Sequence, residues 1–286
     1  MIIHPIEAGN FKLDGGAMFG VVPKSIWNKT NPADHTNKID IAARCMLVEN
    51  GNQLILIDTG MGNKQSDKFF SYFSPWGYDT LKNSIQKTGY SLNEITDVFL
   101  THLHFDHVGG ATIINKSNQL IEPLFKNAVY WSNQKHWLWA TNPNDRESAS
   151  FLKENLQPLE QSGQLKFTDL SSQNLNKLNS LPFSAYIVNG HTEKQMLPVL
   201  QYKDKTLVFM GDLLPTAGHV PLPYIMGYDI RPLITLKEKK QFLDDAAKNN
   251  WYLFLEHDAH NEIITVKHTE KGVRINKKYT FNEVFN

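Results

Sequence analysis

The fold of this chain is indicated by one stretch, Thr101-His102-Leu103-His104-Phe105-Asp106-His107-Val108-Gly109-Gly110. Three histidines and one aspartate fall within six residues, directly after the apolar run 98–100. Residues i and i+2 of an extended segment point to the same side, so His102 and His104 can hold one metal ion together. Asp106 and His107 come after the chain begins to turn and can face a second ion close by. The spacing therefore favours two ions over one.

The two glycines that end the stretch, Gly109 and Gly110, permit the tight backbone turn that we expect to follow. A surface loop that happens to be rich in histidine is the plain alternative. Four possible ligands at one strand end, followed by a glycine pair, are specific enough to favour a metal site over such a loop.

Three further residues of ligand type follow apolar runs later in the chain: His191, Asp212 and His257. Strand ends and the loops that leave them are where a rigid scaffold presents functional groups. A lone histidine after a strand is more often a hydrogen-bonded structural residue than a ligand. Together with residues 102–107, however, these three positions favour a role in metal binding.

The remaining sequence predicts strands with interspersed helices. Apolar runs bounded by turn residues predict strands over 42–49, 53–58, 98–100, 128–131, 183–188, 197–201, 206–210, 251–255, 263–266 and 273–279. Helices are predicted over 81–89, 132–140, 146–159 and, from a capping-box pattern at 235–238, through residue 247. Residues 61–80 are predicted to be a loop rich in aromatic side chains. This alternation is typical of an α/β fold, and the lack of a Pro-, Gly- or Ser-rich linker predicts a single domain over 1–286.

Composition narrows the class of partner. Of 286 residues, 41% are hydrophobic, which supports a sizeable core, and 29 Lys and Arg balance 29 Asp and Glu. This neutrality disfavours a nucleic-acid partner. The single cysteine, Cys45, lies in an apolar run and is expected in the core. We expect a cytoplasmic protein with no membrane partner, because no signal-peptide pattern or membrane-length apolar run is seen.

Five short motifs together resemble the metallo-β-lactamase superfamily of metal-dependent hydrolases. They are Asp58-Thr59-Gly60, His102-x-His104-x-Asp106-His107, Gly190-His191-Thr192, Gly211-Asp212 and Glu256-His257-Asp258. They occur in the order expected of the family and span residues 58–258. The resemblance implies a four-layer αβ/βα sandwich of two packed sheets, with helices outside and metals at one rim.

The resemblance also implies a role for each matched residue. The first metal would be held by His102, His104 and His191, the second by Asp106, His107 and His257, with Asp212 bridging both. Asp58 would either orient a ligand histidine or serve as a hydrogen-bonding residue at a strand end. Five histidines and two carboxylates suit two divalent ions, zinc by preference, and the resemblance allows iron or manganese.

A dinuclear site of this kind predicts hydrolysis by a hydroxide shared between the ions. A bound zinc ion lowers the pKa of water from ~15.7 to roughly 7. Asp106 is placed to orient this hydroxide and to move a proton towards the leaving group. We therefore predict a dinuclear metal-dependent hydrolase that cleaves an ester or lactone bond in a largely apolar small molecule.

The substrate pocket must come from the loops around these motifs. Aromatic or apolar side chains at 69–78, Trp137, Trp139, Tyr224, Met226 and Tyr228 would form an apolar pocket if they converge; otherwise they are core. Candidates for substrate contact or proton donation are Tyr224, Tyr228 and His219.

Within the superfamily the sequence looks closest to enzymes that hydrolyse N-acyl homoserine lactones and to methyl parathion type organophosphate hydrolases. The segment 16–23 contributes to that resemblance. Lactonases of this group typically place a tyrosine three residues after the bridging aspartate, whereas this chain has Pro215 there. A phosphoesterase of organophosphate or nuclease type, a thioester hydrolase and a metal-stabilised binding module therefore stay as alternatives. A homodimer is expected only by resemblance.

Overall fold

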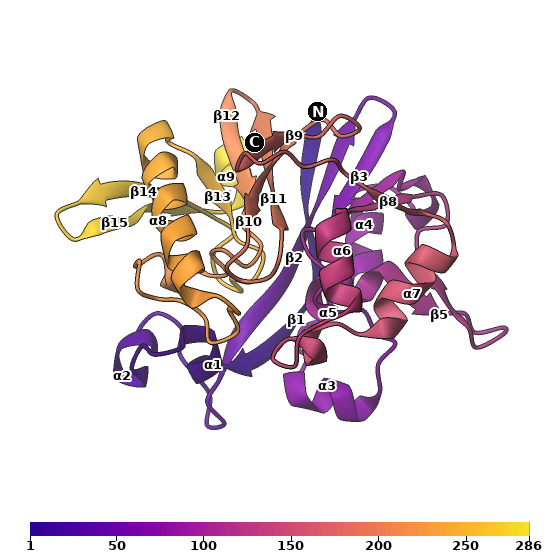
Figure 1. Ribbon diagram of the computed structural model, residues 1–286, viewed down its shortest axis with the longest axis horizontal. Helices are drawn as coiled ribbons and strands as arrows, with labels where there is room; N and C mark the ends of the chain where they lie inside the picture. The colour runs from indigo at the N-terminus through magenta and orange to yellow at the C-terminus, as the bar shows by residue number, and fades with distance from the viewer. Residues whose placement is uncertain (286) are drawn as a thin grey trace. The chain divides into compact units, whose positions relative to one another are not determined.

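A computed structural model describes residues 1–285 (Figure 1). Contacts within the chain define two compact units. Unit 1 consists of Met1–Asn10 and Ala43–Ser172, and unit 2 of Phe11–Ala42 and Gln173–Asn286. The single domain over 1–286 stays a prediction.

A six-stranded sheet has the order β1-β2-β3-β4-β7-β8. Its strands are β1 (Ile2–Asp14), β2 (Lys38–Asn50), β3 (Gln53–Ile57), β4 (Asp97–Phe99), β7 (Val129–Ser132) and β8 (Leu165–Phe167). The predicted hairpin is confirmed, with Asn50 paired to Gln53 across a two-residue turn. From β3 to β8 the strands are parallel. Parallel strands are covered on both faces, which explains why residues 54–57 of β3 are apolar and buried throughout.

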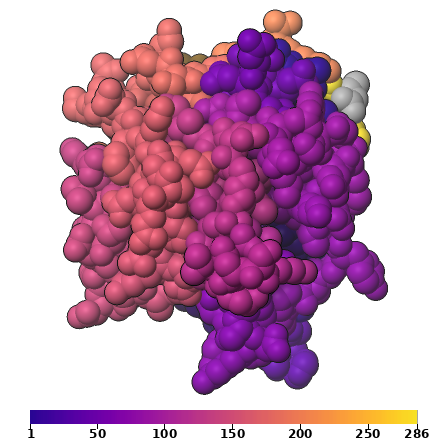
Figure 2. All heavy atoms as spheres, turned by 90° about the vertical axis from the view of Figure 1, so that its right-hand side faces the viewer, coloured from indigo at the N-terminus to yellow at the C-terminus, as the bar shows by residue number. Residues whose placement is uncertain are grey.

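Short helices and a small second sheet complete unit 1. The helices are α3 (Asp67–Phe73), α4 (Leu81–Lys87), α5 (Phe105–Val108), α6 (Gln134–Thr141) and α7 (Lys153–Gln161). Single 3-10 turns cover Leu92–Glu94, Gly109–Ala111 and Ser148–Ser150, and β5 (Thr112–Ile114) pairs with β6 (Ile121–Pro123). The side of unit 1 that carries β5 and α7 faces the viewer in Figure 2. Cys45 is fully buried in the core of this unit, as predicted.

One loop prediction in unit 1 and the start of one predicted helix were wrong. The loop predicted over 61–80 contains α3, whose first turn is capped by the side chain of Ser66. Helix α3 has only seven residues, four of them aromatic, and aromatic residues are weak helix formers, so its sequence did not stand out from a loop. The helix predicted over 146–159 begins only at Lys153, because residues 148–150 form a 3-10 turn and Leu152 is extended.

Unit 2 is built on a seven-stranded sheet with the order β15-β14-β13-β12-β11-β10-β9. Its strands are β9 (Leu175–Lys177), β10 (Ser184–Val188), β11 (Gln195–Tyr202), β12 (Lys205–Phe209), β13 (Tyr252–Phe254), β14 (Ile263–Thr269) and β15 (Gly272–Tyr279). Only the β12–β13 pair is parallel. The helices are α1 (Gly15–Phe19), α2 (Lys24–Trp27), α8 (Pro232–Asn249) and α9 (Phe281–Phe285), with a 3-10 turn at Ala217–His219.

The start of α8 differs from the predicted capping box at 235–238. The helix begins at Pro232, where proline is well tolerated because the first helical N–H has no intrahelical partner. Glu238 instead accepts hydrogen bonds from the backbone N–H groups of Asn189 and Gly190, at 2.9–3.0 Å. A carboxylate on α8 therefore fixes the loop that leads from β10 to His191.

The predicted mixed α/β class is confirmed by these two large sheets and their helices. Within residues 1–285, no helix combines the length and the apolar content that crossing a membrane requires.

Candidate metal centre

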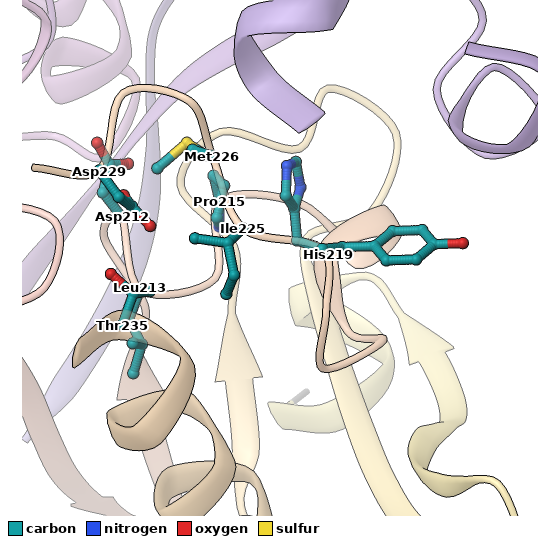
Figure 3. Close-up of a pocket in the computed structure, with 9 residues that line it drawn as sticks. Asp212, Leu213, Pro215, His219, Ile225, Met226, Asp229 and Thr235 are labelled. Atoms are coloured by element: carbon teal, nitrogen blue, oxygen red, sulfur yellow. The ribbon is translucent and has the colours of Figure 1, made fainter. Parts of the chain in front are cut away.

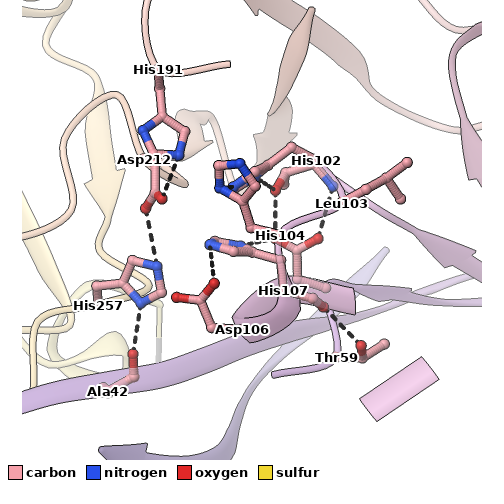
Figure 4. Close-up of polar contacts among 12 residues, drawn as sticks. Ala42, Thr59, His102, Leu103, His104, Asp106, His107, His191, Asp212 and His257 are labelled. Atoms are coloured by element: carbon pink, nitrogen blue, oxygen red, sulfur yellow. Dashed lines mark hydrogen bonds and ion pairs between the residues drawn. The ribbon is translucent and has the colours of Figure 1, made fainter. Parts of the chain in front are cut away.

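Four predicted ligands lie together where the chain leaves β4. Residues 101–104 are non-helical, and His104 is the N-cap of α5, which carries Asp106 and His107. His102 Nε2 lies 3.0 Å from His104 Nδ1. Asp106 Oδ1 lies 3.9 Å from His107 Nε2. The local prediction of one histidine pair followed by two ligands on a turn agrees with this geometry (Figure 4).

A network around Asp58 sets the proton positions of two histidines. The Asp58 carboxylate can only accept, so it receives the hydroxyl proton of Thr101 at 2.6 Å and the Nδ1 proton of His107 at 3.0 Å. Because the Thr101 hydroxyl proton is used in this way, its oxygen accepts from Nδ1 of His102 at 3.1 Å. Both histidines therefore carry their lone pair on Nε2. Asp58 orients a histidine and also bonds the backbone N–H of Thr101 at a strand end, so both earlier interpretations hold.

His104 is oriented by an acid that the sequence did not single out. Its Nε2 donates to Oε1 of Glu147 at 3.0 Å, and Glu147 is almost completely buried. Oε2 of Glu147 accepts from the side chains of Trp139 and Asn144. The lone pair of His104 is therefore on Nδ1, which faces His102.

These assignments bring two nitrogen lone pairs face to face. Nε2 of His102 and Nδ1 of His104 are 3.0 Å apart and both are acceptors in the neutral rings. Two lone pairs at this distance repel each other unless a cation lies between them. Imidazole nitrogens with hydrogen bonds to their second nitrogen are typical zinc ligands, so this pair fits a divalent metal ion.

The two glycines after α5 serve a different purpose from the one predicted. Neither has a positive φ. A Cβ on Gly109 would lie 2.1 Å from the carbonyl oxygen of Met61, and one on Gly110 would lie 2.2 Å from that of Thr59. Glycine is required because the backbone of 59–61 passes too close for any side chain. This contact places the motif at 58–60 against the histidine stretch.

Unit 2 has its own cluster, centred on Asp212. Oδ2 of Asp212 lies 3.0 Å from Nε2 of His191, and Oδ1 lies 3.0 Å from Nε2 of His257. On the other side of each ring, His191 Nδ1 donates to Asp229 at 2.8 Å and His257 Nδ1 donates to the carbonyl of Ala42 at 2.8 Å. One carboxylate thus joins two histidines whose second nitrogens are fixed by protein acceptors. Figure 4 shows Asp212 between His191 and His257, and the bond from His257 to Ala42.

The carboxylates of this cluster favour a positive charge, carried by a proton or a metal ion, beside Nε2 of His191. Burial alone would lower the pKa of His191, but Asp212 and Asp229 on its two sides raise it to about 10. Two carboxylates around one imidazole select a proton or a metal ion at the position between His191 and Asp212. The donor set, imidazole nitrogen with carboxylate oxygen, fits zinc and also iron or manganese.

The predicted substrate residues of unit 2 fall in different places. A small pocket beside Asp212 is lined by Tyr224, Met226, His219 and Pro215 among others (Figure 3). Tyr228 is not among its lining residues and is 41% exposed.

His219 is better suited to packing than to proton transfer. Nε2 donates to the carbonyl of Met18, and Nδ1 bonds the hydroxyl of Thr216, both at 2.8 Å. Its ring stacks on Phe19, with centroids 4.2 Å apart. Burial lowers the pKa of His219 to about 3, so the ring is neutral. Its catalytic role stays a prediction.

The aromatic side chains of unit 1 divide between surface and core. Phe69 and Phe73 of α3 contact Phe105, with ring centroids 5.4 and 4.9 Å away, and all three are half-buried. Trp137 instead belongs to the core, and Trp139 bonds Glu147. The aromatic loop is thus adjacent to the residue that precedes Asp106, whereas the tryptophans have structural roles.

Sequence reasoning missed Glu147 and Asp229, which fix His104 and His191. Neither lies in a recognisable motif, and Glu147 follows the polar segment 142–146, which has the composition of a surface loop. Their 43-residue and 38-residue separations from the histidines leave no local signal.

Residues 40–257 match the sequence profile of the metallo-beta-lactamase superfamily. No curated protein matches the chain by sequence. Among solved structures, a probable metal-dependent hydrolase from Staphylococcus aureus is 26% identical, with a TM-score of 0.84 over 97% of this chain and 95% of that one.

Two further solved structures share the fold. AidC, a dizinc quorum-quenching lactonase, is 24% identical over 98% of this chain and 95% of its own, with a TM-score of 0.78. The hydrolase AbOPH of the beta-lactamase superfamily is 20% identical over 96% and 92%, with a TM-score of 0.75.

Proposed function

Because the chain belongs to the metallo-β-lactamase superfamily, we propose that it is a metal-dependent hydrolase that cleaves an ester or lactone bond. In this proposal the chain holds two divalent ions, zinc by preference. The ligands would be His102, His104, Asp106, His107, His191, Asp212 and His257. The dizinc lactonase that shares the fold supports this choice of metal.

The observation that carries the proposal is shared by all five histidines. Each has one ring nitrogen committed to a protein acceptor and therefore presents the other. The acceptors are Thr101 for His102, Glu147 for His104, Asp58 for His107, Asp229 for His191 and the carbonyl of Ala42 for His257. Such partners are the usual means by which proteins orient histidines for metal binding. This shared arrangement favours the interpretation of the five histidines as metal ligands over their interpretation as packed core residues.

Divalent ions held by these residues would act as Lewis acids and would lower the pKa of a bound water molecule towards neutrality. The chain supplies the proton acceptor. Asp106 is on the first turn of α5, and its side chain, 12% exposed, is more accessible than those of the ligand histidines, Asp58 and Asp212. We assign to Asp106 the orientation of the attacking water and the transfer of its proton towards the leaving group.

An apolar substrate is supported by the aromatic cluster Phe69, Phe73 and Phe105. All three rings are half-buried. Phe105 immediately precedes Asp106 in the chain, and Phe69 and Phe73 contact Phe105. Apolar surface with few polar groups is typical of small-molecule sites. Pro215 lines the pocket beside Asp212 and offers no hydroxyl, so an ester is proposed alongside a lactone. Tyr224, in the same pocket, is the proposed proton donor or substrate contact.

The substrate is proposed to be a small molecule, with neither a nucleic acid nor a membrane as partner. A cytoplasmic location and a homodimer stay predictions.

A substrate panel tests the function. Purified protein would first be analysed for bound metals, with two ions per chain as the expected result. It would then be assayed on N-acyl homoserine lactones, aryl esters and phosphotriesters, with added zinc, iron or manganese and with chelator. We expect turnover of a lactone or aryl ester that chelator removes and metal restores. A single tightly held ion with no turnover would favour the metal-stabilised binding module, and turnover of phosphotriesters alone would favour the organophosphate hydrolase.

A further inference from the structure

A second concavity lies in unit 2, bordered by residues 220–223, by α8 and by the turn between β14 and β15. It encloses about 380 Å³. Its lining consists of Val220, Leu222, Pro223, Lys240, Leu243, Asp244, Lys271, Gly272, Val273 and Arg274. None of these residues lines the pocket beside Asp212. We propose that this groove binds a small amphiphilic carboxylate, an anionic head group on an apolar chain, at a site separate from that pocket.

The apolar part of the groove is firmly built. Val220, Leu243 and Val273 are buried and belong to the core of unit 2. The half-buried Leu222 and the exposed Pro223 add further apolar surface to the lining. An apolar chain placed here would cover side chains that are already fixed by packing. Binding would therefore cost little side-chain conformational entropy.

Buried Lys239 holds one wall of the groove in place. Its Nζ donates to the carbonyl oxygens of Pro221 and Tyr224, at 3.1 and 2.8 Å. Because Lys239 is on α8, these two bonds tie the segment 221–224 to a helix that also lines the groove. The groove is therefore preformed.

The charges around the groove favour an anion. The residues that line the groove include three cations, Lys240, Lys271 and Arg274, and one carboxylate, Asp244. Lys240 already pairs with Asp244 at 2.9 Å, and His268 lies 3.9 Å from the same carboxylate. The charges of Lys271 and Arg274 are thus left without a carboxylate of the groove to balance them.

Arginine adds a specific preference for a carboxylate head group. One guanidinium nitrogen of Arg274 donates to the carbonyl of Val273 at 2.7 Å. A guanidinium has five N–H donors in a planar fork, so further donors can bind a carboxylate in pairs.

The size of the groove indicates a small molecule and not a protein partner. Small-molecule sites commonly enclose ~300–1,000 Å³ and are mostly apolar with a few polar groups. A stable protein partner buries about 800 Å² on each side, far more than ten lining residues provide. The apolar lining, the cationic side chains and the volume of the groove therefore all favour a small amphiphilic carboxylate.

Decanoate is a suitable probe for the metal-loaded full-length protein. Binding would be measured by titration calorimetry and located by amide chemical shifts in NMR spectra. We expect saturable shifts at Val220, Leu222 and residues 272–274. Acetate, which lacks the chain, and decyltrimethylammonium, which reverses the head-group charge, should not produce them.

A pair of matched variants tests the role of charge. Lys271→Glu with Arg274→Glu should weaken decanoate binding roughly tenfold or more. Lys277→Glu with Lys278→Glu makes the same change at exposed positions of the same strand and should leave the affinity unchanged. If the first variant does not fold, Lys271→Gln provides a milder test.

Three results would overturn the proposal. They are no saturable binding of decanoate, equal affinity in the charge-reversed and control variants, and shifts confined to residues beside Asp212 such as Leu213 and Met226. None of these measurements depends on hydrolysis, so the outcome is independent of the proposed activity.

Discussion

Oδ2 of Asp58 lies 3.0 Å from Nδ1 of His107, although the two residues are 49 positions apart in the sequence. Both side chains are fully buried. The same carboxylate oxygen accepts the hydroxyl of Thr101, which in turn bonds His102. One aspartate therefore decides which nitrogen each of two candidate ligands presents.

Asp58→Asn should weaken metal binding without unfolding the protein. The amide group has only one acceptor oxygen, and its NH₂ cannot accept the proton of His107 Nδ1. We expect a loss of about 10–100-fold in zinc affinity or activity, measured by competition with a chromophoric chelator. Asp169→Asn, at an exposed position, is the control. Equal zinc affinity in the two variants would show that Asp58 has no part in orienting ligands.

Glu147→Gln should disturb His104 through its tautomer. Trp139 and Asn144 both donate to Oε2, so the glutamine oxygen is expected on that side and its NH₂ towards His104. His104 would then carry its proton on Nδ1, the nitrogen that faces the other histidine of the pair. We expect a loss of about 10–100-fold in metal affinity and a changed ¹⁵N tautomer signature in the NMR spectrum.

The exposed Glu160→Gln serves as the matched control for that experiment. A normal tautomer together with full metal affinity in Glu147→Gln would contradict the positioning role.

Asp106→Asn should abolish hydrolysis in a chain that stays folded. An amide cannot take a proton from the attacking water, and removal of a general base typically lowers the rate by about 10²–10⁴-fold. His104→Ala should have the same effect, because it removes a proposed metal ligand. Turnover would be compared after circular dichroism and metal analysis of each variant. Unchanged turnover in a folded, metal-loaded Asp106→Asn would remove Asp106 from the mechanism.

Lys239 should make stability depend on pH in an unusual direction. Burial lowers its pKa in the folded state to about 7, whereas the unfolded value is about 10.4. Between these values the unfolded chain holds a proton that the folded chain lacks. The free energy of unfolding therefore rises with pH in this range. The slope of this contribution approaches about 1.4 kcal/mol per pH unit. Below pH 7 the contribution is constant.

Lys239→Met should remove this dependence. The test is chemical denaturation of both proteins at pH 7, 8 and 9 in chelator, with the exposed Lys240→Met as control. The slope against pH is the readout, because the variant also loses two hydrogen bonds. Parallel slopes for wild type and Lys239→Met would contradict the prediction.

Gly109→Ala should destabilise the protein by about 1–3 kcal/mol, a typical cost of overpacking. Its Cβ would meet the backbone of Met61 at 2.1 Å, and backbone cannot move aside as a flexible side chain can. In Gly16→Ala the nearest atom is a side-chain oxygen of Asp14 at 3.0 Å, so a smaller loss is expected. Thermal and denaturant unfolding of both variants would compare the two costs.

The sequence predicts well what depends on neighbouring residues. Most strands are confirmed because apolar runs and turn residues are local signals. The pairing of His102 with His104 follows from the alternation of side chains in an extended chain. The turn predicted after His104 is the start of α5. Helix α3 was missed because it is only seven residues long and is rich in aromatic residues, which are weak helix formers.

The tertiary structure decides what depends on residues far apart in the chain. Glu147 looks like a surface acid in the sequence, yet it is buried against His104. Gly109 looks like a turn residue, yet it is needed because Met61 passes beside it. The sequence alone determined which side chains are able to bind a metal. Only the folded chain determined which nitrogen each histidine presents, because that choice depends on an acceptor brought by long-range packing to the other side of the ring.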